Sequence, residues 1–339
     1  MATGCHAGCS VRCPQRIGFH RYVHTNGNRL RTARPYTGGE ARKSRPGGPL
    51  IILYCSGDES VYRSHMSTTT SDASVAPRAR PFAAEETARI KAHFFRDGFC
   101  FIPGVLERDE ITALRQAVDH VFEGLKSKDS NKLYGSYVAV RLFEDDPVFE
   151  AILTREPIIT LVEEILGKNC HLIAQNVVRN APGQAIDAFH ADELVFFPVS
   201  EGMERHDPRL RMPVFLVTVQ IPLTDIPSIE YGPTEFVPGS HYSGRNPNDP
   251  KNPIFQGQGP VPIFCKAGDI YLHNGQCWHR GAPNSSNQMR YLLQLAYGMR
   301  FVSQRFYPFV NYQLPQRVYD RADERRKRVL GFHPKGPYG

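Results

Sequence analysis

Apolar side chains follow a helical spacing in the first half of this chain and a strand-like spacing in the second half. The spacing predicts a first helix over residues 83–95, followed by a short strand over residues 99–103. A second helix is expected from Asp109, whose carboxylate can cap the first turn. A third helix is expected over residues 158–166, where Gly167 ends it.

In the second half, short apolar segments alternate with clusters of Gly, Pro, Asn and Asp, which is typical of strands joined by turns. Strands are expected over residues 171–179, 188–197, 213–223, 234–237, 270–273 and 291–297. Helices followed by many short strands predict an α+β fold, here a double-stranded β-helix (a cupin-like jelly roll) with a layer of helices on one face. The basic run 325–328 is expected to form the solvated face of a short helix.

The first 79 residues are expected to lie outside this fold, which leaves residues 80–339 as one domain. Residues 1–65 are rich in Arg, Gly and Pro and poor in acids, as in an organelle transit peptide. The alternative, which we favour, is that translation starts at Met66 and that the upstream segment belongs to the gene model and not to the protein.

The net charge of +7 comes from this N-terminal segment. Residues 1–65 carry ten Lys and Arg against three Asp and Glu, so the remaining residues are balanced. A balanced domain exerts no general attraction on a polyanion, so no nucleic-acid partner is expected. No stretch of about 18 apolar residues exists, so no membrane partner is expected either. The pattern specifies no oligomeric state.

The eight cysteines do not follow the spacing of a disulfide framework. Cys5, Cys9 and Cys13 are evenly spaced, but their spacing matches no iron–sulfur or zinc motif. Cysteines within apolar segments, such as Cys100, are expected to be buried free thiols. Free thiols are typical of a reducing compartment, so a cytoplasmic location is expected.

The candidate chemistry begins with His190 and Asp192, which lie two residues apart in an expected strand. Side chains at i and i+2 lie on the same face of a strand, so the imidazole and the carboxylate can meet at one point. His279 lies far downstream, just before a turn. Two imidazoles and one carboxylate can form a facial triad, which leaves adjacent positions on iron(II) open. Each residue alone is also explained by an ordinary hydrogen bond, so the hypothesis rests on their combination.

Arg290 is the fourth candidate residue. The segment 281–288 is dense in turn formers, which predicts that His279 and Arg290 lie on adjacent antiparallel strands. A guanidinium at this position can hold a carboxylate through two parallel hydrogen bonds. The alternative is an arginine at a strand edge that pairs with a surface acid.

These residues and two further motifs resemble the phytanoyl-CoA dioxygenase family. The segment 231–241, YGPTEFVPGSH, is similar to that family's NGP-x-x-x-x-PGSH motif, with Tyr231 where Asn is usual. The segment 97–104, DGFCFIPG, is similar to the start of the family's domain, and the resemblance covers roughly residues 81–338. His241, which ends the longer motif, is expected to order its turn and not to bind metal.

The resemblance implies a role for each candidate residue. The iron(II) ligands would be His190, Asp192 and His279. The residues that bind 2-oxoglutarate would be Arg290, which would hold the distal carboxylate, together with Thr234 and Gln175. No catalytic residue beyond the metal ligands is implied.

The resemblance also implies a dioxygenase that uses iron(II), 2-oxoglutarate and O2 to oxidise a small organic molecule, with release of succinate and CO2. Hydroxylation is the default outcome, while desaturation, epoxidation and demethylation stay open. Halogenation is disfavoured, because halogenating relatives lack the carboxylate that Asp192 supplies. A substrate from secondary metabolism is favoured over an acyl-CoA, because the domain has no basic patch for phosphates.

Two other classes of function remain open at this point. Zinc also accepts two His and one carboxylate, so a cupin-like zinc hydrolase or isomerase is possible, although such a site needs no anchor such as Arg290. The other is a jelly-roll binding module without catalysis, in which the histidines are structural.

Overall fold

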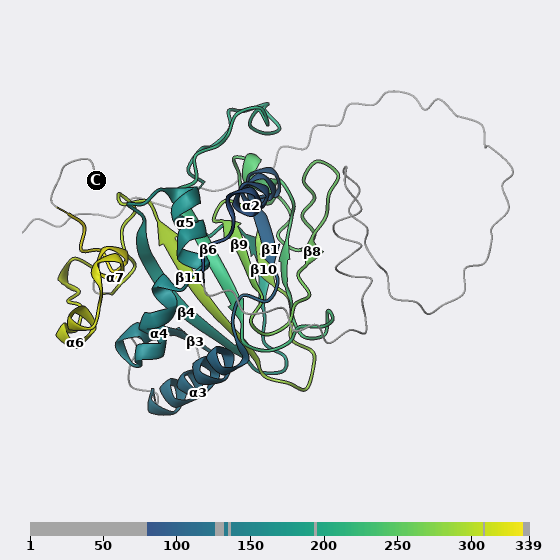
Figure 1. Cartoon of the computed structure of the whole chain (residues 1–339). Coiled ribbons are helices and arrows are strands. Elements are labelled where there is room, and N and C mark those ends of the chain that lie inside the picture. Colours follow the sequence, from purple (N-terminus) through teal and green to yellow (C-terminus); the bar gives the residue numbers. More distant parts are fainter. Residues whose placement is uncertain (1–79, 126–131, 135–136, 193–194, 308, 335–339) are drawn as a thin grey trace, which may run out of the picture. The chain divides into compact units, whose positions relative to one another are not determined.

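The computed structural model contains two antiparallel sheets and a layer of helices, and it describes residues 80–125, 132–134, 137–192, 195–307 and 309–334. In the seven-stranded sheet the order is β1-β9-β6-β11-β4-β3-β2 (Figure 1). Their bounds are Phe99–Ile102, Ile270–Asn274, Leu216–Pro222, Arg290–Gly298, His171–Asn180, Val138–Val140 and Leu133–Tyr134. The four-stranded sheet has the order β5-β10-β7-β8, with bounds Ile186–His190, His279–Gly281, Thr234–Phe236 and Val261–Pro262.

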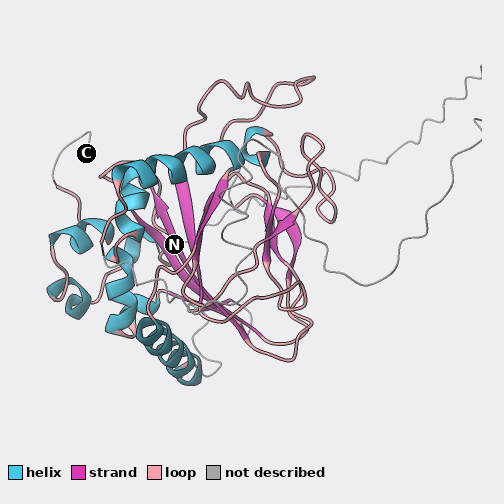
Figure 2. Cartoon of the chain, turned by 45° about the vertical axis from the view of Figure 1, so that its right-hand side comes forward, coloured by secondary structure: helices cyan, strands magenta, loops and turns pink. Residues whose placement is uncertain are grey.

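The helices lie mainly on the outer side of the seven-stranded sheet, away from the four-stranded sheet (Figure 2). The α-helices are α2 Ala84–Asp97, α3 Arg108–Gly124, α4 Pro147–Ala151, α5 Ile158–Leu166, α6 Gln316–Asp320 and α7 Glu324–Val329. Short 3-10 helices cover Leu142–Glu144, Ile152–Thr154, Ser240–Tyr242 and Phe309–Asn311. This arrangement is the predicted jelly roll with helices on one face.

Strand β11 shows how alternation builds both layers of the core. Tyr291, Leu293, Leu295 and Tyr297 belong to the large cluster that the helices cover, while Leu292 belongs to a second cluster between the two sheets. Successive side chains of a strand point to opposite faces, so one strand serves both layers. The inner face of the larger sheet therefore faces the smaller sheet, and the functional site lies between them.

Helix α3 begins one residue before the expected cap. Its N-cap is Glu107, whose side chain accepts the backbone N–H of Glu110, while the Glu110 carboxylate accepts the N–H of Glu107 at 2.8 Å. The prediction of Asp109 as the cap was wrong, because this reciprocal capping box satisfies two backbone donors at once. Asp109 lies in the first turn, where its negative charge interacts favourably with the helix dipole.

The basic run near the C-terminus is not the solvated helix face that the sequence predicts. Arg325 on α7 donates to both carboxylate oxygens of Glu163 on α5, at 3.0 and 2.6 Å, and to Glu156 at 2.5 Å. Arg328 also donates to Glu163. The ion pairs of Arg325 and Arg328 therefore attach the C-terminal segment to the helical layer.

The described cysteines are buried free thiols, as expected: Cys100, Cys170, Cys265 and Cys277. Burial raises the pKa of Cys100 to about 12, so this thiol stays protonated. The expected leader, with Cys5, Cys9 and Cys13, lies outside the described residues, so the domain boundary at residue 80 stays a prediction. No helix in the described part of the chain is long and apolar enough to cross a membrane.

Candidate metal and carboxylate site

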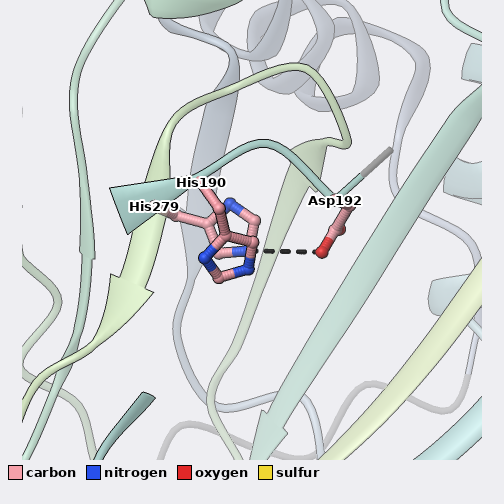
Figure 3. Close-up of side chains that lie close together, drawn as sticks. All are labelled: His190, Asp192 and His279. Carbon is pink, nitrogen blue, oxygen red and sulfur yellow. Dashed lines mark ion pairs between the residues drawn. The ribbon is translucent and has the colours of Figure 1, made fainter. Parts of the chain in front are cut away.

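The side chains of His190, Asp192 and His279 lie close together (Figure 3). His190 ends β5, Asp192 lies two residues later, and His279 begins β10. One potential ligand atom from each lies within 4.8 Å of the others. Antiparallel pairing of β5 with β10 places His190 directly opposite His279, which brings their ring centroids to 4.6 Å. The structure thus brings together the three residues that the sequence predicts as metal ligands.

The two histidines have the same ring orientation relative to their backbone. The Nδ1 atom of His190 lies 2.9 Å from the carbonyl oxygen of Ala188, and that of His279 lies 2.9 Å from the carbonyl oxygen of Cys277. A carbonyl oxygen only accepts, so each neutral ring carries its hydrogen on Nδ1 and keeps the lone pair of Nε2 free. Backbone carbonyls of this kind commonly orient metal-binding histidines, so the donor set fits a divalent metal.

The charges of the three groups shift one another's pKa values. Burial by itself raises the pKa of Asp192, but His279, whose Nε2 lies 3.4 Å from Asp192 Oδ1, together with the charges of His273 and His190 holds the pKa far below its usual value. Burial opposes protonation of His279, yet the Asp192 carboxylate raises its pKa overall. Burial and the charge of His279 lower the pKa of His190. The site therefore has an ionised carboxylate next to one easily deprotonated imidazole.

Two geometric expectations from the sequence were wrong. The strand expected over residues 188–197 ends at His190, so Asp192 lies outside the strand and is held by its own N–H, which donates to the carbonyl oxygen of Gly275 at 2.8 Å. His279 and Arg290 are not on adjacent strands: β10 belongs to the smaller sheet and β11 to the larger one. The turn-rich segment between them crosses from one sheet to the other, so the two residues lie on different sheets.

Arg290 is buried, with 4% of its surface exposed, and faces the smaller sheet. A Cβ atom at Gly281 of β10 would lie 3.3 Å from Arg290 Nη2, so the missing side chain there leaves room for the guanidinium. Nη2 donates to Asn180 Oδ1 at 2.8 Å, and β4 and β11 hold these two residues opposite each other. Burial lowers the pKa of Arg290, but a guanidinium stays charged in proteins.

Three buried donors near this guanidinium lack an acceptor among the described residues: Arg290 Nε, Arg290 Nη1 and Asn180 Nδ2. A buried cation without a counter-charge is costly, and so is each buried donor without a partner. Because all three groups are donors, an anion with several acceptor oxygens would satisfy them. A carboxylate is such an anion.

Thr234 and Tyr271 lie on opposite sheets, and their hydroxyl oxygens are 2.8 Å apart. Thr234 is opposite Gly281 in the β7–β10 pair, which places it beside the guanidinium of Arg290. Sequence reasoning missed Tyr271 and Asn180. Both residues lie at inward-facing strand positions, which alternation along the strand could have indicated. Tyr271 is two residues before His273 on β9, and Asn180 is the last residue of β4.

The structure does not bring Gln175 to this site. Its Oε1 accepts the backbone N–H of Phe143 at 2.7 Å and its Nε2 donates to the carbonyl oxygen of Phe149 at 2.9 Å. Both partners lie in the helical layer, so Gln175 is on the outer face of β4 and its role in cosubstrate binding was wrongly predicted. The next residue, Asn176, is on the inner face, opposite Gln294. The pleat decides which of the two neighbouring amides faces the site.

His241 is not part of the cluster of His190, Asp192 and His279, and its contact is with helix α2. It is buried, and its Nε2 donates to the carbonyl oxygen of Phe95 at 3.2 Å, at the end of α2. Burial lowers its pKa to about 4, so the ring is neutral at physiological pH.

The fold and the site together identify the class of protein. The model of the phytanoyl-CoA dioxygenase family matches residues 94–292, and the chain belongs to this family. Among curated proteins, the chain is 24% identical over 253 residues to the uncharacterized protein Mb1539 of Mycobacterium bovis, covering 70% of this chain and 84% of that protein. The uncharacterized protein Rv1501 of Mycobacterium tuberculosis matches to the same extent.

Solved structures share the fold at low sequence identity. The epimerase SnoN, in complex with Fe3+, alpha ketoglutarate and nogalamycin RO, has a TM-score of 0.51 at 22% identity, covering 66% of this chain and 87% of its own. The carbocyclase SnoK from nogalamycin biosynthesis has a TM-score of 0.51 at 21% identity, covering 70% and 91%. HygX from Streptomyces hygroscopicus, with nickel and 2-oxoglutarate bound, has a TM-score of 0.50 at 18% identity, covering 66% and 90%.

Proposed function

We propose that this protein is an iron(II)- and 2-oxoglutarate-dependent dioxygenase that hydroxylates a small organic molecule of secondary metabolism. In the proposed reaction, O2 and 2-oxoglutarate are consumed and succinate and CO2 are released. The observation that carries this proposal is the presence of two distinct sites in the same domain. A cluster of two His and one Asp lies at one place, and at another Arg290 and Asn180 have buried donors without an acceptor among the described residues.

A dicarboxylic acid fits this pair of sites, because each of its ends finds a different partner. His190 and His279, through Nε2, and Asp192 would hold the metal and leave adjacent positions on it open for one end of the cosubstrate. Arg290 and Asn180 would receive the other carboxylate with their free donors. This division explains why a cationic side chain is buried without an acidic partner in the described part of the chain.

The residues near Arg290 would complete the carboxylate site. The Thr234 and Tyr271 hydroxyl groups, which contact each other at 2.8 Å, can each donate to a carboxylate oxygen. Tyr271 is fully buried and burial raises its pKa, so it would act as a neutral donor. Arg290, Thr234 and Tyr271 are all buried, and burial strengthens hydrogen bonds of this kind.

Bound iron(II) and 2-oxoglutarate would together supply the activation of O2 that no protein side chain provides. The chain's own residues would bind and orient these groups, and Asp192 would supply the carboxylate ligand that halogenating relatives lack. Hydroxylation is therefore proposed over halogenation. Solved neighbours described as an epimerase and a carbocyclase show that this fold also supports other outcomes.

Two rival functions predict different properties. A zinc hydrolase would have no use for the buried donors around Arg290, and a binding module would not need the lone pairs of His190 and His279 at one point. The ligands of the neighbours favour the oxygenase: SnoN was solved with Fe3+ and alpha ketoglutarate, and HygX with nickel, 2-oxoglutarate and hygromycin B. These ligands also support a small-molecule substrate.

The test is an anaerobic titration of the metal-free protein with iron(II) and 2-oxoglutarate, followed by visible absorption. The expected result is a weak charge-transfer band that saturates at one equivalent of iron(II) and is absent in the variant His190→Ala. The matched control is His120→Ala, an exposed histidine on α3, which should keep the band. Stoichiometric zinc binding without any such band would overturn the proposal in favour of the zinc enzyme.

A further inference from the structure

Two side chains of the seven-stranded sheet lie beside one oxygen of the Asp192 carboxylate. Thr218 on β6 donates its hydroxyl hydrogen to Asp192 Oδ2 at 3.2 Å. His273 on β9 has its Nε2 atom 3.8 Å from the same oxygen. Both residues are buried, His273 completely. Neither was assigned a role by the sequence motifs.

The sheet holds these two residues in fixed positions. Thr218 and His273 are directly opposite each other in the antiparallel pair of β6 and β9, so both side chains lie on the inner face. Gln220, the next inward residue of β6, has its amide nitrogen 3.3 Å from His273 Nε2. The His273 ring also packs against Phe236 and His279, at centroid distances of 5.1 and 4.4 Å. Strand pairing and ring packing thus hold Thr218 and His273 in place.

The two oxygens of Asp192 consequently face different surroundings. Oδ1 lies 3.4 Å from His279 Nε2, on the side of the metal ligands, while Oδ2 is turned toward Thr218 and His273. Asp192 itself lies outside any strand, so its backbone fixes this orientation less firmly than a sheet would. Something other than secondary structure must decide which oxygen faces the metal.

We propose that Thr218, with the buried His273 ring opposite it on β9, is a positioning residue that retains Oδ2 on the sheet, so that Asp192 binds the metal through Oδ1 alone. A carboxylate free to rotate could bind through both oxygens and occupy a position that cosubstrate or O2 needs. This inference rests on the proposed function, because it assumes a metal at His190, Asp192 and His279. Residues that orient ligands in this way typically contribute about 10- to 100-fold to metal affinity.

The experiment compares two threonine substitutions that remove a hydroxyl group and keep the side-chain shape. Thr218→Val removes the hydrogen bond to Asp192, whereas Thr234→Val removes a hydroxyl beside Arg290. Both variants, Thr218→Ser and the wild type are titrated anaerobically with cobalt(II), by calorimetry and by the visible spectrum of the bound ion. 2-Oxoglutarate is then added to each cobalt-loaded protein.

The expected result is separation of the two effects. Thr218→Val should bind cobalt(II) about 10- to 100-fold more weakly, with a changed spectrum because the coordination number changes, and Thr218→Ser should restore both properties. Thr234→Val should bind cobalt(II) like the wild type but bind 2-oxoglutarate more weakly. The rescue by serine distinguishes a lost hydrogen bond from a misfolded variant.

Two results would overturn the inference, and only the second would also overturn the proposed function. Wild-type cobalt(II) affinity and spectrum in both Thr218→Val and the double variant Thr218→Val/His273→Asn would overturn the positioning role and leave the proposed function standing. A wild-type protein that binds no divalent metal would overturn both.

Discussion

His190 and His279 lie directly opposite each other on paired strands, with ring centroids 4.6 Å apart and each Nδ1 bonded to the carbonyl oxygen two residues earlier. The register of a single strand pair therefore brings the two imidazole rings together, and the backbone carbonyls fix the ring hydrogens on Nδ1. With Asp192 beside them, one potential ligand atom from each of the three residues lies within 4.8 Å of the others.

Metal binding should stabilise the folded protein through these two histidines. A ligand present at about 100 times its Kd adds about 2.7 kcal/mol to the free energy of unfolding. Anaerobic thermal unfolding should therefore show a higher Tm for the wild type with iron(II) than without it, and no such rise for His279→Ala. The variant His241→Gln, in a buried histidine outside the site, should keep the rise. An equal rise in His279→Ala would place the metal elsewhere.

Replacement of Arg290 by Gln should weaken the binding of 2-oxoglutarate and spare the binding of metal. The change removes charge-assisted hydrogen bonds worth about 1.5–3 kcal/mol, which corresponds to a loss of affinity of about 10- to 100-fold. The measurement is a 2-oxoglutarate titration of the iron-loaded protein without oxygen. Arg280→Gln is the matched control, because Arg280 on β10 pairs with Glu235 at 2.6 Å and not with the site. Equal affinity in Arg290→Gln and Arg280→Gln would contradict the assignment.

Metal affinity should fall as the pH falls, and one proton should account for the first part of the decrease. The pKa of His279 is raised above its ordinary 6.5 by Asp192, whereas that of His190 is lowered. Below the raised pKa, a proton on His279 must leave before the metal binds, so affinity should decrease about tenfold per pH unit. His190 should compete only at lower pH.

The check is the Kd for cobalt(II) between about pH 5.5 and pH 8.5, within which a histidine proton is exchanged. Affinity that does not change with pH over this range would argue against His279 as a ligand. The metal-free protein should show the opposite trend for this group. The raised pKa of His279 stabilises the fold below its unfolded value of 6.5, and that contribution is lost as the pH rises through the raised pKa.

The attachment of the C-terminal segment should depend on Glu163. This residue receives Arg325 and Arg328 and is largely shielded, with 12% of its side chain exposed. Glu163→Gln removes the charge from both pairs and should lower the free energy of unfolding by about 1–3 kcal/mol, as measured by urea denaturation. The neighbouring Glu164→Gln is the control: Glu164 is 48% exposed and pairs with Lys91, so its loss should cost under about 1 kcal/mol. Similar losses in both variants would mean that the C-terminal network adds little.

The sequence by itself predicted the α+β class, the third helix and most of the strands, because each of these depends on local spacing. Residues 158–166 form α5, and the strand expected over residues 171–179 is β4, one residue longer. The motif residues could be found as well, because His190, Asp192, His279 and Arg290 are chemically distinctive and lie in recognisable segments. Local periodicity and residue chemistry are properties that a sequence displays directly.

The tertiary structure alone decided how these residues meet. Only the pairing of β5 with β10 and the place of β11 in the other sheet show that Arg290 faces the site across the interior and is not on an adjacent strand. Only the pleat shows that Gln175 faces the helices, while Asn180, Thr218 and His273 face the site. A shift of one residue in a strand reverses the face on which a side chain lies. Contacts between sheets join residues far apart in the chain, so their geometry is fixed by packing and cannot be seen in any local pattern.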